Sequence, residues 1–238
     1  MSTWICKPKT LLAAILAVGL AGCSDVPGGS SGGNPFGFLS QAPDRIVVAS
    51  KSVVIAGPPG YCVDKSSTRD SNTGAFVLLG SCASISNSVL AKAPQTPGLL
   101  TASVSSASDT EIARSLDRLE SFFESDAGRA ALARDGRAQS VQVLETRKTE
   151  NAFHIHARDS SANTIAGITE DYWRGLLDVR GRIVTVSVVG FAGKPMSPSN
   201  GLSTLDAFAT RILQENPQQV ASAGPDAAKG GFWGRLLQ

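Results

Sequence analysis

The pattern of hydrophobic and polar residues divides the chain into an apolar N-terminal stretch, a polar linker and a long region of mixed strand and helix patterns. Residues 11–20 read LLAAILAVGL, an apolar run that is too short to cross a bilayer as a helix. Residues 24–43 are rich in glycine, serine and proline, a composition typical of a flexible tether with a span of roughly 25 Å. Regular patterns begin at Arg45 and continue to Asn216. A single folded domain is therefore predicted over residues 44–216.

Most of this domain has the patterns of β-strands. Arg45–Ala56 is rich in β-branched residues and precedes a Gly-Pro-Pro-Gly turn, so it is predicted to be one strand. Arg182–Phe191 is so apolar that we expect a central strand covered on both faces. Arg180-Gly181 predicts a tight antiparallel connection to the strand before it, and the polar stretch Asp64–Gly74 predicts a loop. The other predicted strands are Ala75–Leu79, 99–105, Ser140–Arg147, Ala152–Arg158 and part of 165–179.

Two regions have the periodicity of amphipathic helices. The first opens with a capping box from Ser108 to Glu111, and a second short helical stretch follows at 128–134. The last helix is predicted at 203–215 and ends at the Asn-Pro step 216–217. Helices on one face of a mostly antiparallel sheet of about six to seven strands, an α+β fold, are the economical packing for this order. The apolar stripes of the helices are Ile112, Leu116, Leu119 and Phe123, and Leu205, Phe208, Ala209 and Ile212.

The first 22 residues have the arrangement of an export signal, with two lysines before the apolar run. Leu20-Ala21-Gly22-Cys23 follows that run and resembles the lipobox of bacterial lipoproteins. The resemblance implies that residues 1–22 are removed and that Cys23 becomes an acylated, palmitate-bearing N-terminus. Ser24 after the cysteine implies delivery to the outer membrane, on its periplasmic side. An ordinary secreted protein with cleavage nearby is the alternative.

Removal of the signal changes the charge and cysteine counts. The chain has 22 Lys and Arg and 20 Asp and Glu in 238 residues. Two of the lysines lie in the signal, so 20 basic and 20 acidic residues remain and no nucleic-acid partner is predicted. Once Cys6 is removed and Cys23 is acylated, Cys62 and Cys82 are left. In an oxidising envelope compartment this pair predicts a disulfide, rather than two free thiols or a metal site.

Two histidines are the best candidates for metal ligands. His154 and His156 lie two apart on a predicted strand and so face the same side, and imidazole is a common ligand of zinc and copper. The chain has no third histidine, so further ligands would be carboxylates such as Glu150, Asp159 or Asp171. The alternative is a pair of solvated residues on the polar face of a strand whose other face is apolar. No motif indicates a catalytic residue or a cofactor.

Residues 217–238 are predicted to form a linker and an apolar C-terminal tail. Phe232, Trp233, Leu236 and Leu237 would share one face of a helix. Such a face suits a membrane interface or the groove of a partner protein. Folding of the tail onto its own domain is the alternative.

These observations predict a membrane-anchored envelope lipoprotein whose domain is a binding or scaffolding module, with the membrane and possible envelope proteins as partners. The alternatives are an envelope metal-binding protein or enzyme that uses His154 and His156, and a carrier of a small ligand or lipid. The order of the predicted elements is also loosely similar to that of the PsbP-like fold of small envelope lipoproteins of the DcrB type. That similarity implies a fold and no activity.

Overall fold

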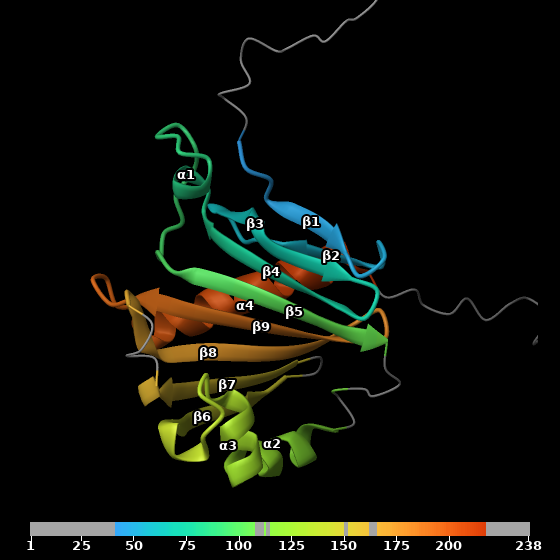
Figure 1. The fold of residues 1–238 in the computed structure, drawn as a ribbon, viewed down its shortest axis with the longest axis vertical. Coiled ribbons are helices and arrows are strands. Elements are labelled where there is room, and N and C mark those ends of the chain that lie inside the picture. Colours follow the sequence, from blue (N-terminus) through green and yellow to red (C-terminus); the bar gives the residue numbers. More distant parts are fainter. Residues whose placement is uncertain (1–40, 108–111, 113–114, 150–151, 162–165, 218–238) are drawn as a thin grey trace, which may run out of the picture. The chain divides into compact units, whose positions relative to one another are not determined.

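A seven-stranded antiparallel sheet forms the centre of the protein (Figure 1). The structure is a computed structural model that describes residues 41–107, 112, 115–149, 152–161 and 166–217. The strands of the sheet are β3 (Tyr61–Ser71), β4 (Gly74–Ser81), β5 (Leu99–Ala107), β6 (Val141–Lys148), β7 (Ala152–Asp159), β8 (Ile168–Val179) and β9 (Arg182–Phe191). Their order across the sheet is β3-β4-β5-β9-β8-β7-β6, and β1 (Arg45–Val48) and β2 (Val53–Ala56) form a separate hairpin.

The helices lie on both faces of the sheet. The α-helices among the described residues are α1 (Cys82–Ile85), α2 (Leu116–Glu124), α3 (Asp126–Leu132) and α4 (Pro198–Glu215), and a short 3-10 turn spans Ala138–Ser140. Figure 1 shows α4 behind the sheet and α2 and α3 at its β6–β7 end, on the near side. The α+β class and the mostly antiparallel sheet are confirmed. The placement of the helices differs from the expectation that they share one face.

Two hydrophobic cores explain this arrangement. Under α4, the predicted stripe Leu205, Phe208, Ala209 and Ile212 packs against alternate residues of the strands, among them Val186 of β9. On the opposite face, Phe123 of α2 and Leu132 of α3 pack against Phe153 and Ile155 of β7. Successive residues of a strand point to opposite faces. Strands β7 and β8 are therefore buried on both faces, with one helical layer over each.

Two predictions near the N-terminal end of the domain were wrong. Arg45–Ala56 is a hairpin, because Ala49, Ser50 and Lys51 have φ angles of 53°, 59° and 63° and turn the chain back on itself. Asp64–Gly74 is mostly strand, because it pairs with β4 at the edge of the sheet, where its side chains beyond Val63 are half-buried or exposed. A polar edge strand has no apolar alternation by which the sequence could reveal it.

Other boundaries were predicted more closely. Strand β9 has the predicted limits and lies at the centre of the sheet, and Arg180 and Gly181 make the predicted tight turn with φ angles of 51° and 69°. The expected coverage of β9 holds for the face under α4, whereas Thr185 and Ser187 on the other face are half-buried. Helix α4 begins earlier than predicted, because the Ser197 side chain accepts a hydrogen bond from the Asn200 amide at 3.2 Å.

The remaining helix boundaries shift slightly or fall outside the description. Helix α3 begins two residues before the predicted 128–134 stretch, with Ser125 as its N-cap. The predicted capping box at 108–111 lies outside the described residues. Within the described part of the chain, no helix is long and apolar enough to span a membrane.

Candidate functional site

The two candidate histidines lie on β7 and face α4. His154 is 4% exposed and His156 is 8% exposed. The alternative of two solvated residues on a polar face of the strand was wrong, because α4 and the neighbouring β8 residues cover that face. Strand pairing places Gly175 beside His154 and Trp173 beside His156. A Cβ atom at position 175 would lie 3.3 Å from Cδ2 of His154, so glycine leaves the room that this imidazole occupies.

Each histidine has a different environment. Nδ1 of His154 lies 3.4 Å from Oδ1 of Asp206 on α4, and its Nε2 has no hydrogen-bond partner in the described structure. The His156 ring stacks on Trp173 with 4.7 Å between ring centroids, and its Nε2 lies 4.0 Å from Oδ1 of Asp171. Burial lowers the pKa of both histidines, and the neighbouring carboxylates oppose that shift only in part. Burial therefore favours the neutral form of both side chains.

A metal site at this pair lacks further ligands in the described part of the chain. No cluster of three or more His, Cys, Asp or Glu side chains suited to a metal occurs among the described residues. The two imidazoles also have separate neighbours, Asp206 for His154 and Asp171 for His156. Of the carboxylates suggested as additional ligands, Asp159 is engaged elsewhere and Asp171 lies beside His156 alone, and position 150 is outside the described residues.

A cavity of about 420 Å³ opens beside His156, between the sheet and the N-terminal end of α4. The stacked rings of His156 and Trp173 line it, together with an ion pair in which Arg158 Nη2 lies 3.2 Å from Oδ1 of Asp171. The Trp173 indole donates a hydrogen bond to the Pro198 carbonyl at 3.0 Å, which fixes the ring against α4. The remaining lining residues are Leu144, Tyr172, Val188, Gly190, Met196, Ser197 and Gly201.

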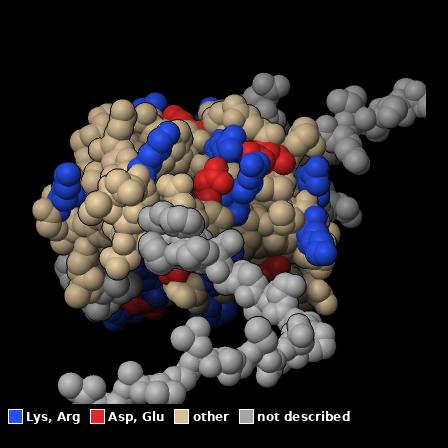
Figure 2. Space-filling model, turned by 90° about the horizontal axis from the view of Figure 1, so that it is seen from above, with Lys and Arg blue, Asp and Glu red and all other residues tan. Residues whose placement is uncertain are grey.

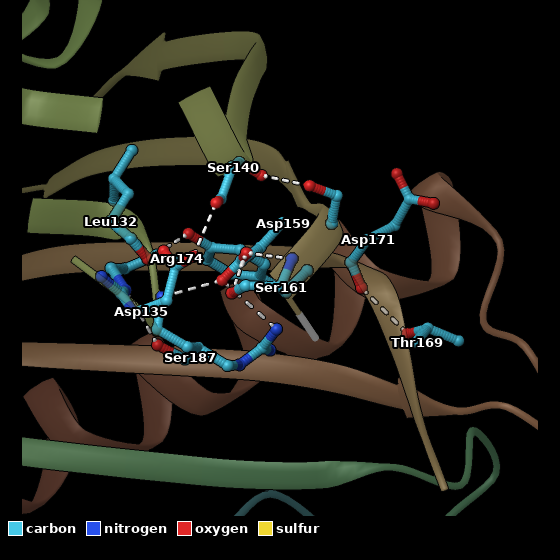
Figure 3. Close-up of polar contacts among 12 residues, drawn as sticks. Leu132, Asp135, Ser140, Asp159, Ser161, Thr169, Asp171, Arg174 and Ser187 are labelled. Carbon is cyan, nitrogen blue, oxygen red and sulfur yellow. Dashed lines mark hydrogen bonds and ion pairs between the residues drawn. The ribbon is translucent and has the colours of Figure 1, made fainter. Parts of the chain in front are cut away.

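The Asp159 carboxylate has a structural role, because its oxygen atoms are already engaged by neighbouring groups. It is fully buried, and its carboxylate accepts hydrogen bonds from the Arg134 amide at 2.9 Å and from the Ser161 amide at 2.9 Å (Figure 3). The Arg134 guanidinium lies 3.6 Å from the same carboxylate. These contacts tie the end of β7 to the segment that follows α3.

Tyr172 is held in a similar way on the face opposite α4. Its hydroxyl donates a hydrogen bond to the Leu132 carbonyl at 3.0 Å, and the guanidinium groups of Arg134 and Arg174 each lie 5.3 Å from its ring centroid. Arg174 also donates to the Ser187 hydroxyl at 3.2 Å (Figure 3). Burial raises the pKa of Tyr172. Sequence patterns did not single out this cluster or Trp173, since only the folded sheet brings their partners together.

The predicted disulfide is confirmed. Cys62 of β3 and Cys82 of α1 are bonded, with their Cα atoms 4.7 Å apart, and the two residues are 2% and 4% exposed. The bond attaches the start of α1 to the edge of the sheet. The other predicted site residues, Cys23 near the N-terminus and Phe232, Trp233, Leu236 and Leu237 near the C-terminus, lie outside the described residues.

Compared with known protein families, with curated proteins and with solved structures, the chain matches none of them.

Proposed function

We propose that this chain is an envelope lipoprotein, anchored to a membrane through Cys23, whose α+β domain is a binding module. The observation that carries the proposal is the buried Cys62–Cys82 disulfide in a chain that also has the Leu20-Ala21-Gly22-Cys23 motif. Disulfides persist in oxidising compartments and are rare in reducing ones, so the bond and the motif independently support export. With Ser24 after the cysteine, we assign the protein to the periplasmic side of the outer membrane.

Membrane fractionation tests the anchor. Wild-type protein is expected in the membrane fraction and in the detergent phase after phase separation, because two or more acyl chains hold a protein on a bilayer. A Cys23→Ser variant keeps an uncleaved signal, so a second variant is needed in which an export signal without a lipobox replaces residues 1–23. That second variant is expected to be soluble. Membrane association that survives the exchange in a chain that also ends before Phe232 contradicts the lipid anchor.

The cavity beside Trp173 is the ligand site that we propose for the module. Its wall combines the stacked His156 and Trp173 rings with the charged pair of Arg158 and Asp171. Pockets that bind small molecules likewise combine apolar and aromatic surface with a few polar groups. The site therefore suits a flat apolar ligand with an acidic group that forms an ion pair with the Arg158 guanidinium.

Fluorescence of Trp173 tests this site directly. The chain has three tryptophans, and one of them, Trp4, is removed with the signal. In a Trp233→Phe background Trp173 is then the one emitter. We expect anilinonaphthalene sulfonate, a flat aromatic anion, to quench it, and Arg158→Ala to weaken that binding. Arg137→Ala removes a surface arginine away from the cavity lining and serves as the matched control. Equal quenching in all three proteins contradicts the assignment.

We propose in addition that the C-terminal apolar residues contact the membrane or an envelope partner. The hypothesis depends on the spacing of Phe232, Trp233, Leu236 and Leu237 alone. Cross-linking in intact envelopes compares the whole protein with a chain that ends before Phe232. Loss of specific cross-linked products in the shorter chain is the expected result, and an unchanged set of products contradicts the hypothesis.

A further inference from the structure

The loop between α1 and β5 carries an apolar pair at its tip. Val89 is 98% exposed and Leu90 is 83% exposed. The next most exposed large apolar side chain among the described residues is Val47, at 50%. Single exposed apolar side chains are common on protein surfaces, whereas adjacent ones that project together into water mark an interaction site more often. We refer to residues 86–98 as the α1–β5 loop.

The α1–β5 loop is held firmly at both ends. At its start, the Cys62–Cys82 disulfide fixes α1, and the Ser86 amide donates a hydrogen bond to the Cys82 carbonyl at 2.9 Å. Near its end, the Tyr61 hydroxyl donates to the Thr96 carbonyl at 2.5 Å, and burial raises the pKa of Tyr61 to about 12. Between these points the Ala91 amide donates to the Ser88 carbonyl at 3.2 Å. The loop therefore presents its tip from a defined position.

The same end of the domain receives the N-terminal segment. The Ala42 amide donates to the Ser86 hydroxyl at 2.7 Å, and the Val63 amide donates to the Pro43 carbonyl at 2.8 Å. In Figure 1 the first described residues begin beside α1. Residues 23–40 connect the cysteine of the lipobox to this point. The apolar tip thus lies at the end of the domain to which the proposed anchor is attached.

The charge of the loop suits a lipid surface. Residues 82–98 contain no Asp or Glu and one basic residue, Lys92, which is exposed. An apolar tip followed by a lysine suits the layers of a bilayer surface. The apolar side chains can enter the acyl region while the ammonium group stays among the lipid headgroups. Figure 2, which views the molecule from above Figure 1, shows broad uncharged areas on this side with both basic and acidic side chains among them.

We propose that Val89 and Leu90 insert into the membrane that holds the acylated Cys23, and so fix the orientation of the domain at that surface. The inference rests on the proposed lipid anchor. One lipid anchor on a flexible tether leaves the domain free to rotate, and a second contact with the bilayer removes that freedom. The cavity beside Trp173 would then be presented to the periplasm in a constant direction.

Photolabelling from the membrane interior tests the proposal. The full-length lipidated protein is placed in vesicles of phosphatidylethanolamine and phosphatidylglycerol with a trace of phospholipid that carries a diazirine in its acyl chain. After illumination, mass spectrometry locates the labelled residues. We expect label on Val89 and Leu90, and loss of that label in the V89S/L90S double variant. The double variant should still float with the vesicles, because both side chains are exposed and the anchor is intact.

Phe122 provides the matched control, because it is 42% exposed on α2, on another part of the domain. The Phe122→Ser variant should leave the label at the loop unchanged. A wild-type chain that does not float overturns the anchor and this inference together. A chain that floats but has no label at Val89 and Leu90, or as much label at Phe122, overturns the inference alone. If a partner protein, and not the membrane, covers Val89 and Leu90, the chain floats without label at these residues.

Discussion

Removal of the disulfide should lower the stability of the domain by an amount that its loop length sets. Cys62 and Cys82 are separated by 20 positions, and closing a loop of this size in the unfolded chain is worth about 3 kcal/mol at 25 °C in the chain-entropy description. In the folded protein both sulfur atoms are buried, so alanine retains an apolar side chain at each position. Hydrogen bonding between β3 and β4 pairs Cys62 with Gly80 and does not depend on the bond. The loss therefore arises mainly in the unfolded state.

Urea unfolding, followed by tryptophan fluorescence, measures the effect. The Cys62→Ala/Cys82→Ala variant is expected to lose about 3 kcal/mol of unfolding free energy and to show a larger dependence on urea, since its unfolded chain is more expanded. Reduction of the wild-type protein should produce the same loss, and the double variant should not respond to reductant. A loss below about 1 kcal/mol, or a response of the double variant to reductant, would refute this reasoning.

Three further predictions concern buried residues. Asp159→Ala should cost about 3 kcal/mol in urea unfolding, because it leaves the Arg134 amide without its acceptor, and a loss near zero contradicts the assigned role. Gly201→Ala should cost about 1–3 kcal/mol despite the better helix propensity of alanine, since the new Cβ would lie 2.7 Å from Cδ1 of Trp173, and a stabilised variant would show that the close approach is absent. Burial lowers the pKa of His154 below its ordinary 6.5. The contribution of the neutral imidazole to the unfolding free energy is therefore fully present above pH 6.5 and decreases as the pH falls below it, because the unfolded chain then binds a proton that the folded chain does not. His154→Gln should therefore reduce the slope of stability against pH in that range by up to about 1.4 kcal/mol per pH unit, and an unchanged slope contradicts the shift.

Local patterns in the sequence predicted the elements whose signals are local. Strand β9 has a continuous apolar run, and α4 has a clear stripe from Leu205 to Ile212. The disulfide was predictable because the cysteine count left one pair. By contrast, the turn at Ala49–Lys51 has no glycine or proline, so nothing in its sequence indicates three residues in the left-handed region. Strand β3 was missed because its exposed residues are selected for solubility at a sheet edge.

The candidate site depended on contacts that the sequence does not contain. Alternation along β7 placed His154 and His156 on one face correctly, but their burial follows from the packing of α4 more than forty residues later in the chain. The stacking of His156 on Trp173 depends on the register between β7 and β8. Register is a property of the assembled sheet, and a shift of one residue would reverse the faces of the whole strand.

The mass of the mature N-terminal peptide tests the central proposal most directly. The protein is isolated from envelopes, and its first peptide is sequenced and weighed by mass spectrometry. The proposal predicts a peptide that begins at Cys23 and carries a diacylglyceryl group on the thiol and an acyl group on the amine. A mature chain that begins at another residue, or at an unmodified Cys23, would contradict the lipid anchor.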